Sequence, residues 1–202
     1  MLTYHTKDII YQSLVLGDTH LIADDLKQMN EQDWTDLINV SDDHRLGSVL
    51  YQSLSRELIV ELVPQEIVAN LQAQYQLHRI RNLKAYQTLA ELVGLLKSNN
   101  IASVALKGAY LSIFAYPDLA LRPMRDLDLL IPEHQVINAY DLLIAKGYKR
   151  LHGSGGPESA LETAHHLPAL ISPIGVVVEL HHRITQPDKY ETCLITQNIW
   201  SK

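Results

Sequence analysis

Residues 121–132 read Leu-Arg-Pro-Met-Arg-Asp-Leu-Asp-Leu-Leu-Ile-Pro, and they predict a short β-strand. Successive side chains of a strand point to opposite faces, so Asp126 and Asp128 share one face while Leu127, Leu129 and Ile131 line the other. Two neighbouring carboxylates repel each other, and a divalent cation that prefers oxygen ligands, Mg²⁺ or Mn²⁺, is the usual compensation. The alternative is a strand at the edge of a sheet that carries scattered surface acids.

Upstream of this stretch, the sequence predicts a strand that turns directly into a helix. Residues 101–106 form a short apolar run, Lys107 and Gly108 follow at once, and residues 109–116 resume helical spacing. The backbone N–H groups and dipole at such a helix start favour an anion, and Lys107 adds a positive charge. An ordinary turn with a surface lysine remains the alternative.

Downstream, residues 169–171 and 176–181 predict the two arms of a β-hairpin. In the second arm Val177, Glu179 and His181 share one face, and Glu179 interrupts a run of valines. A buried carboxylate is costly unless it is paired or holds a metal, so Glu179 is a candidate metal ligand. An exposed glutamate on an edge strand is the other interpretation.

Two histidine pairs, His165-His166 and His181-His182, raise the question of zinc. Zinc sites usually need three or four well-spaced ligands, and the sequence has no His-x-x-x-His or Cys-x-x-Cys motif. Zinc-dependent hydrolysis is therefore a minor alternative. We expect histidines of these pairs, His166 and His181 among them, to pack or to position a substrate.

The first half of the chain predicts helices alone, with no catalytic motif. Helical spacing of apolar residues covers 6–16, about 19–30, a segment capped by Asp33, a segment capped within 41–43, and one long helix from Pro64 to about residue 98. Cations on the long helix, such as Arg79, Arg81 and Lys84, predict either a solvated face or a contribution to a phosphate site.

Composition narrows the class of protein. The 202 residues contain 17 Lys+Arg and 23 Asp+Glu, a net charge of −6, which gives no global attraction for nucleic acid or anionic membranes. Cys193 is the single cysteine, so no intrachain disulfide forms. The N-terminus lacks signal-peptide features and no apolar run is long enough for a membrane span. These features predict a cytoplasmic protein that does not insert into membranes.

The order of these elements resembles the uncharacterised nucleotidyltransferase family of the polymerase β-like superfamily. The resemblance covers about residues 75–185, with a looser helical match before that. The matching features, in chain order, are Leu106-Lys107-Gly108, Arg122, Asp126-Leu127-Asp128, Gly147-Tyr148, His165-His166 and Val178-Glu179-Leu180-His181. The chain departs from the superfamily where Lys107-Gly108 replaces Gly-Ser, and from the family where His182 replaces tryptophan.

The resemblance implies an α+β fold, with a helical bundle at residues 1–98 followed by a small mixed sheet flanked by helices at residues 99–202. It implies that Asp126, Asp128 and Glu179 bind two Mg²⁺ (or Mn²⁺) ions and carry catalysis. Lys107, Gly108 and Arg122 would bind the triphosphate of an NTP. The reaction would transfer NMP to a hydroxyl of a small molecule, a protein or an RNA, with release of pyrophosphate.

Relatives tend to continue into further helices beyond the point, about twenty residues after Glu179, where this sequence ends. We therefore expect either a fragment, truncated at its C-terminus, or a naturally short form. A second interpretation follows from this end, from the altered Gly-Ser position and from the large helical half. It is a catalytically silent module of the same fold that acts through a protein partner.

Overall fold

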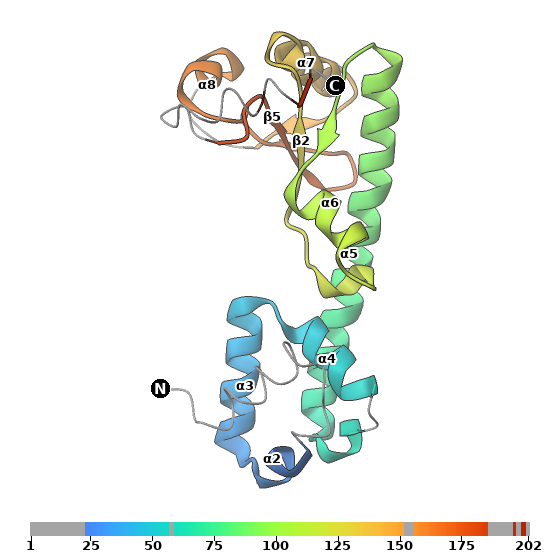
Figure 1. Cartoon of the computed structure of the whole chain (residues 1–202), viewed down its shortest axis with the longest axis vertical. Coiled ribbons are helices and arrows are strands. Elements are labelled where there is room, and N and C mark those ends of the chain that lie inside the picture. Colours follow the sequence, from blue (N-terminus) through green and yellow to red (C-terminus); the bar gives the residue numbers. More distant parts are fainter. Residues whose placement is uncertain (1–22, 57–58, 152–155, 186–195, 197–198, 201–202) are drawn as a thin grey trace. The chain divides into compact units, whose positions relative to one another are not determined.

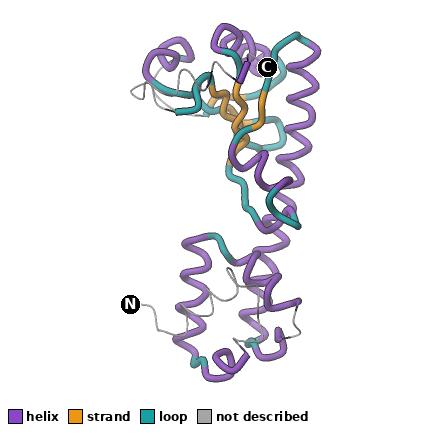
Figure 2. The backbone as a smooth tube through the Cα atoms, in the orientation of Figure 1, coloured by secondary structure: helices purple, strands orange, loops and turns teal. Residues whose placement is uncertain are grey.

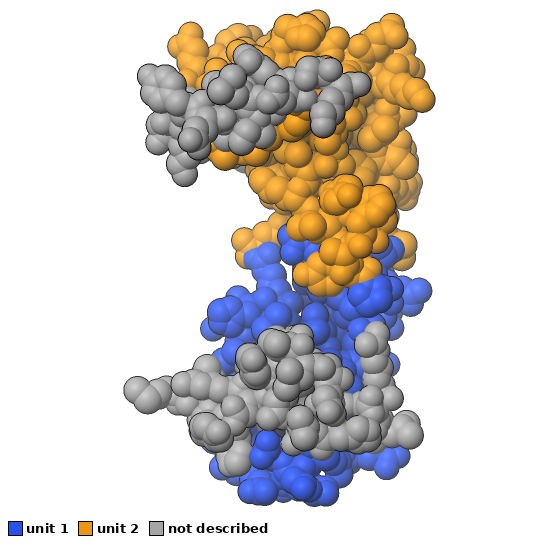
Figure 3. Space-filling view, viewed as in Figure 1, with its two compact units in different colours: residues 1–81, 117–123 blue, residues 82–116, 124–202 orange. Residues whose placement is uncertain are grey.

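The computed structural model describes residues 23–56, 59–151, 156–185, 196, 199 and 200. The helix predicted at 6–16, the first residues of the helix predicted at 19–30, and Cys193 lie outside the described residues. The chain divides into two compact units (Figure 3): residues 1–81 with 117–123, and residues 82–116 with 124–202. We call them unit 1 and unit 2.

Unit 1 is helical where the structure describes it (Figure 2), as the sequence predicts. Its elements are α2 (Ala23–Gln28), α3 (Glu31–His44), α4 (Gly47–Arg56), the 3₁₀ helices η3 (Ile59–Leu62) and η4 (Leu119–Leu121), and the first half of α5 (Gln65–Ser98). The apolar stripes of these helices bury a common core, which includes Leu26, Trp34, Leu37, Leu50, Leu54 and Leu71.

The start of α3 differs from the prediction that Asp33 caps it. Asn30 is the N-cap, and its side-chain oxygen accepts hydrogen bonds from the backbone N–H groups of Gln32 at 2.8 Å and Asp33 at 3.1 Å. Asp33 accepts the Asn30 backbone N–H in return at 3.1 Å, which completes a capping box. A capping box places its acid at the third helical position, so the helix begins earlier than Asp33.

The caps predicted within residues 41–43 are also wrong, because those residues lie inside α3. The helix ends where Arg45 adopts a left-handed conformation with φ of 57° and donates its backbone N–H to the carbonyls of Ser41 and Asp42. This termination satisfies the last carbonyls without glycine, and α4 follows at Gly47.

Unit 2 contains a five-stranded mixed sheet with the order β1-β2-β5-β4-β3. Figure 1 labels its two central strands, β2 and β5. The strands are β1 (Val104–Ala105), β2 (Asp126–Leu130), β3 (Lys149–Arg150), β4 (Leu170–Ile171) and β5 (Val177–His181). The central pair β2 and β5 is parallel, and the other pairs are antiparallel. The edge-strand interpretations of the Asp-x-Asp stretch and of Glu179 are therefore wrong, since β1 and β3 are the edges.

Helices flank this sheet, and most of their positions follow the prediction. They are α6 (Lys107–Phe114), the 3₁₀ turn η5 (Glu133–Gln135) that leads into α7 (Val136–Ala145), and α8 (Pro157–Thr163). The strand predicted at 101–106 is reduced to two residues, because β1 pairs only Val104 and Ala105 with β2. The loop predicted at 152–157 lies largely outside the described residues, and α8 was not predicted.

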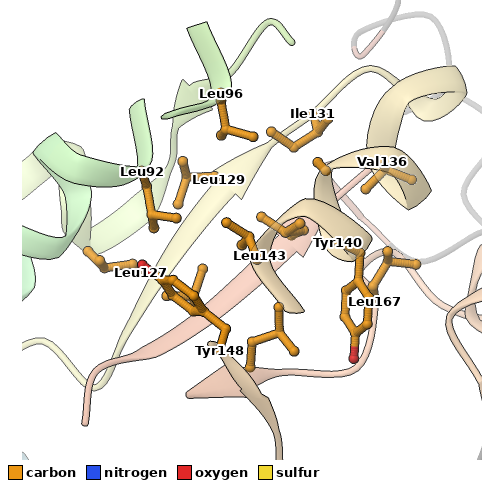
Figure 4. Packing of buried hydrophobic residues seen from close by; sticks show 14 of the residues in the cluster. Leu92, Leu96, Leu127, Leu129, Ile131, Val136, Tyr140, Leu143, Tyr148 and Leu167 are labelled. Atoms are coloured by element: carbon orange, nitrogen blue, oxygen red, sulfur yellow. The ribbon is translucent and has the colours of Figure 1, made fainter. Parts of the chain in front are cut away.

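One face of the sheet packs into the main core of unit 2 (Figure 4). Leu127 and Leu129 of β2 are fully buried against Leu92 and Leu96 of α5 and against the apolar face of α7. Alternation along the strand puts Asp126 and Asp128 on the opposite face. The buried leucines therefore determine which face carries the carboxylates.

The long helix α5 belongs to both units. Its residues up to Arg81 group with unit 1, and residues from Asn82 onward group with unit 2, where Leu92 and Leu96 contribute to the core of the sheet. The structural units thus divide the chain inside this helix, whereas the predicted domain boundary falls at residue 98. Among the helices of the described ranges, none combines the length and the apolar character that crossing a bilayer requires.

Replacing Leu129 with alanine tests the packing of this core. Leu129 is fully buried, so Leu129→Ala should lower the free energy of unfolding by about 2–5 kcal/mol through lost transfer energy and a residual cavity. Urea denaturation measures the change. Ile174→Ala is the matched control, since Ile174 is 44% exposed and its truncation should change stability by less than about 0.5 kcal/mol.

The stability of unit 1 should depend on His78. Burial, together with the nearby charge of Arg81, lowers the pKa of His78, and its Nδ1 lies 2.7 Å from Ser48 Oγ. The unfolded state therefore binds the proton more readily, and stability is lost as pH falls from about 6.5 through the folded pKa. Urea unfolding of wild type and His78→Gln at pH 7.5 and pH 5 tests this. The wild-type advantage should shrink at pH 5, and a constant difference would contradict the assignment.

Candidate functional site

The parallel pairing of β2 and β5 creates the candidate site. In its register Asp128 lies opposite Glu179, Asp126 opposite Val177, and Leu130 opposite His181. Paired residues of neighbouring strands point to the same face, so Asp126, Asp128, Glu179 and His181 all project from the face away from the main core. Residues about fifty positions apart in the chain thereby form one polar group.

Lys107 provides the first positive charge in this group. Its Nζ donates to Asp128 Oδ1 at 2.7 Å, although the lysine side chain is about half exposed. Two features of the backbone position Lys107. The Leu106 N–H donates to the Asp128 carbonyl at 2.9 Å, and Lys107 itself has a φ of +45°. A left-handed backbone at a long side chain is uncommon and is often found at functional sites.

His181 is the second donor to the same oxygen. Its Nε2 lies 2.7 Å from Asp128 Oδ1 and 3.5 Å from Glu179 Oε2, and its side chain is fully buried. The imidazole therefore connects the carboxylates of the two central strands. Within the described residues, the other ring nitrogen, Nδ1, has no hydrogen-bond partner.

The three carboxylates titrate differently because their surroundings differ. Burial and the negative charges of Asp128 and Glu179 raise the pKa of Asp126. Burial also acts to raise the pKa of Asp128, but the hydrogen bonds from His181 and Lys107 outweigh it, so this pKa falls below its usual value. Asp128 is thus the stably ionised member of the pair, whereas at Asp126 burial and repulsion outweigh the attraction of Lys107.

Glu179 and His181 stabilise each other's charged forms. The hydrogen bond to His181 lowers the pKa of Glu179 more than burial raises it. For His181, burial favours the neutral ring, but its hydrogen bonds to Asp128 and Glu179 prevail and raise its pKa. Lys107 and His181 therefore compensate the charges of Asp128 and Glu179, whereas Asp126 has no such donor in this group.

His166 and His165 complete the surroundings of Glu179. An isolated β-bridge pairs His166 with His181, and His166 Nε2 lies 3.9 Å from Glu179 Oε2. The ring centroids of His165, His166 and His181 are 4.7–5.2 Å apart. Sequence reasoning nominated His166 and His181, and the structure brings both to the carboxylates. Their predicted role in positioning a substrate stays a prediction.

Sequence reasoning missed the contacts that anchor the start of α6. The Tyr86 hydroxyl on α5 forms hydrogen bonds with Ser112 Oγ and, at 3.3 Å, with the Ala109 carbonyl. Ser112 Oγ also donates to the Gly108 carbonyl at 2.8 Å. These contacts fix the turn at Lys107 and Gly108 against α5. A tyrosine on a long helix offered no sequence signal of this role.

The structure offers less support for a phosphate-binding role at Gly108 and Arg122 than at Lys107. A Cβ at Gly108 would lie 3.5 Å from the Met124 side chain, an ordinary contact, so packing does not require glycine there. Arg122 is the C-cap of η4 and groups with unit 1, whereas the carboxylates belong to unit 2. The predicted role of both residues in phosphate binding stays a prediction.

A cavity of about 850 Å³ elsewhere in unit 2 involves none of these residues. Its walls include Pro132, Glu133, His182 and Arg183, which follow the C-terminal ends of β2 and β5. His182 extends one residue beyond β5, and burial is the main reason why its pKa is lowered. None of the three carboxylates, Asp126, Asp128 and Glu179, therefore lines this cavity.

The donor set at the carboxylates fits a divalent cation. One ligand atom each from Asp128, Glu179 and His181 lies within 4.8 Å of the others, which is close enough for three atoms to contact a single ion. Asp126 adds a carboxylate on the same face. Ionised oxygens with an imidazole nitrogen are common ligands of divalent metals.

Comparison with protein families adds one finding. A family model described as "Uncharacterised nucleotidyltransferase" matches residues 30–202. Comparisons with curated proteins and with solved structures found no significant match. The family match includes every candidate residue of the site and most of the helical half.

Replacing Lys107 with methionine tests the charge balance around Asp128. Removing this donor should raise the pKa of Asp128, because burial would then be opposed only by His181. The ¹³C chemical shift of the Asp128 carboxyl group, followed against pH, measures the change. Lys97→Met, at the exposed end of α5, is the matched control and should leave that titration as it is in wild type. An unchanged Asp128 titration in Lys107→Met would exclude the contact in solution.

Proposed function

Because the chain belongs to the uncharacterised nucleotidyltransferase family, we propose that it transfers a nucleoside monophosphate from an NTP to a hydroxyl group and releases pyrophosphate. The observation that carries this proposal is the pairing of Asp128 with Glu179 across the parallel strands, with Asp126 on the same face. Three carboxylates on one sheet face match the chemistry that a phosphoryl-transfer site with divalent cations needs.

Asp126 and Asp128 are proposed as the paired metal ligands, and Glu179 as the third carboxylate. Mg²⁺ or Mn²⁺ bound there would neutralise triphosphate charge and make the acceptor hydroxyl a better nucleophile. The raised pKa of Asp126 supports this assignment, because burial and, after it, the repulsion from Asp128 and Glu179 disfavour its charged form. Neutralising that repulsion is what a bound cation would do.

Glu179 is also proposed to accept the proton of the acceptor hydroxyl. Its side chain is 20% exposed, unlike the nearly buried Asp128, so solvent and a substrate can reach it. The hydrogen bond to His181 keeps it ionised at neutral pH. An ionised carboxylate at the boundary between the core and solvent is suited to act as a base.

Lys107, Gly108 and Arg122 are proposed to bind the triphosphate. Lys107 lies at the first turn of α6, where free backbone N–H groups and the helix dipole favour an anion. Its long side chain is half exposed, so Nζ can exchange a carboxylate oxygen for a phosphate oxygen. Such a cation would stabilise the charge that grows on the leaving pyrophosphate.

Thermal melting with NTPs tests the proposed function. Wild-type protein should show a rise in melting temperature that needs both an NTP and Mg²⁺ or Mn²⁺, because a ligand of the folded state stabilises it by mass action. At a ligand concentration about 100 times Kd, the stabilisation is about 2.7 kcal/mol. Asp126→Asn and Asp128→Asn should each abolish this response.

Asp141→Asn is the control for this experiment. Asp141 is an exposed carboxylate on α7 in the same unit, so its neutralisation should leave the ligand response as in wild type. A response that persists in both Asp126→Asn and Asp128→Asn would contradict the assignment of the site. No response in wild type with any of the four NTPs would favour a catalytically silent module that acts through a protein partner.

A further inference from the structure

The histidines beside Glu179 distinguish this site from one made of carboxylates alone. His166 Nδ1 lies 2.8 Å from the Leu167 carbonyl, which only accepts hydrogen bonds, so Nδ1 carries a proton and donates it. In the neutral ring, Nε2 then has its lone pair available. In a metal-ligating histidine, one ring nitrogen binds the metal, and the other commonly donates its N–H to a group such as a backbone carbonyl.

The free nitrogen of His166 faces a carboxylate oxygen. His166 Nε2 and Glu179 Oε2 are 3.9 Å apart, which is too far for a hydrogen bond. His181 Nε2 lies 3.5 Å from the same oxygen. Two imidazole nitrogens therefore lie within 4 Å of one oxygen of Glu179. His181 Nε2 also lies 2.7 Å from Asp128 Oδ1.

We infer that His166 and His181 are metal ligands beside Glu179 and Asp128, and that they make the site select a first-row transition-metal dication such as Mn²⁺ over Mg²⁺. This inference rests on the proposed function and specifies its cofactor. Mg²⁺ strongly prefers oxygen ligands, whereas imidazole nitrogen binds first-row transition metals more readily. A mixed set of carboxylates and imidazoles therefore favours a first-row transition-metal dication such as Mn²⁺ over Mg²⁺.

Metal ligation by the two histidines requires no proton donor or acceptor other than solvent. His166 in its neutral form offers Nε2 directly. His181 shares a proton with Asp128 Oδ1, and His181 Nε2 would release that proton to solvent in order to act as a metal ligand. The buried position of His181 and the partial burial of His166 restrict competing water at this end of the site.

Electron spin echo spectroscopy of bound Mn²⁺ tests the inference directly. The unpaired electrons of Mn²⁺ couple to a ligating ¹⁴N nucleus, so the wild-type protein with Mn²⁺ and no nucleotide should show nitrogen modulation. Labelling histidine with ¹⁵N should change that modulation, which assigns it to imidazole. Titration with Mg²⁺ should displace Mn²⁺ only at concentrations at least about tenfold higher.

His166→Gln and His181→Gln should each weaken the modulation and reduce the preference for Mn²⁺. His134→Gln is the matched control, since His134 is an exposed histidine of η5 outside the cluster. His181 is fully buried, so its variant is checked for folding by circular dichroism. His166, with a side chain 30% exposed, decides the result if the His181 variant does not fold.

Three outcomes would overturn the inference, and they are distinguishable. Saturable Mn²⁺ binding that depends on Asp128 but lacks histidine modulation would show ligation by oxygen alone, and the proposed function would stand. Absence of saturable binding of either metal to wild type, with or without NTP, would remove the proposed function as well. Equal affinity for Mg²⁺ and Mn²⁺ would refute the selectivity.

Discussion

The parallel pairing of β2 with β5 is the constraint on which the rest of the structure depends. It lies at the centre of the sheet, with β1 on one side and β4 and β3 on the other. Its register aligns the fully buried Leu127 and Leu129 with Val178 and Leu180, so a slip by one residue would turn these leucines out of the apolar core and the acids into it. The same register places Asp128 beside Glu179, so core packing and site geometry are specified together.

Electrostatic compensation is the second requirement, because Asp128 is only 2% exposed. An isolated buried carboxylate would be strongly destabilising, and here Lys107 and His181 both donate to its Oδ1. The cost of this arrangement falls on Asp126, whose charged form is disfavoured by burial and by its acidic neighbours. This contrast between a neutralised carboxylate and one whose charge is disfavoured supports the proposed cation site.

The helices hold the two strands and the α6 turn in place. The second half of α5 supplies Leu92 and Leu96 to the core and the Tyr86 hydroxyl to the start of α6. Met124, just before β2, donates its backbone N–H to the buried Asn82 side chain of the same helix at 3.1 Å. A single helix thus contacts the segments that carry Lys107 and the Asp-x-Asp strand, which limits their relative movement.

The amino-acid sequence by itself determined the strand that carries Asp126 and Asp128, the shared face of Glu179 and His181, and the helical first half, because alternation and helical spacing are local patterns. It also contained the ordered motifs that identify the family. Only the tertiary structure decided that Glu179 lies opposite Asp128, that Lys107 and His181 bind one oxygen, and that His166 faces Glu179. Pairing between strands depends on segments about fifty residues apart, and helix ends such as Asn30 depend on individual hydrogen bonds, so neither follows from periodicity.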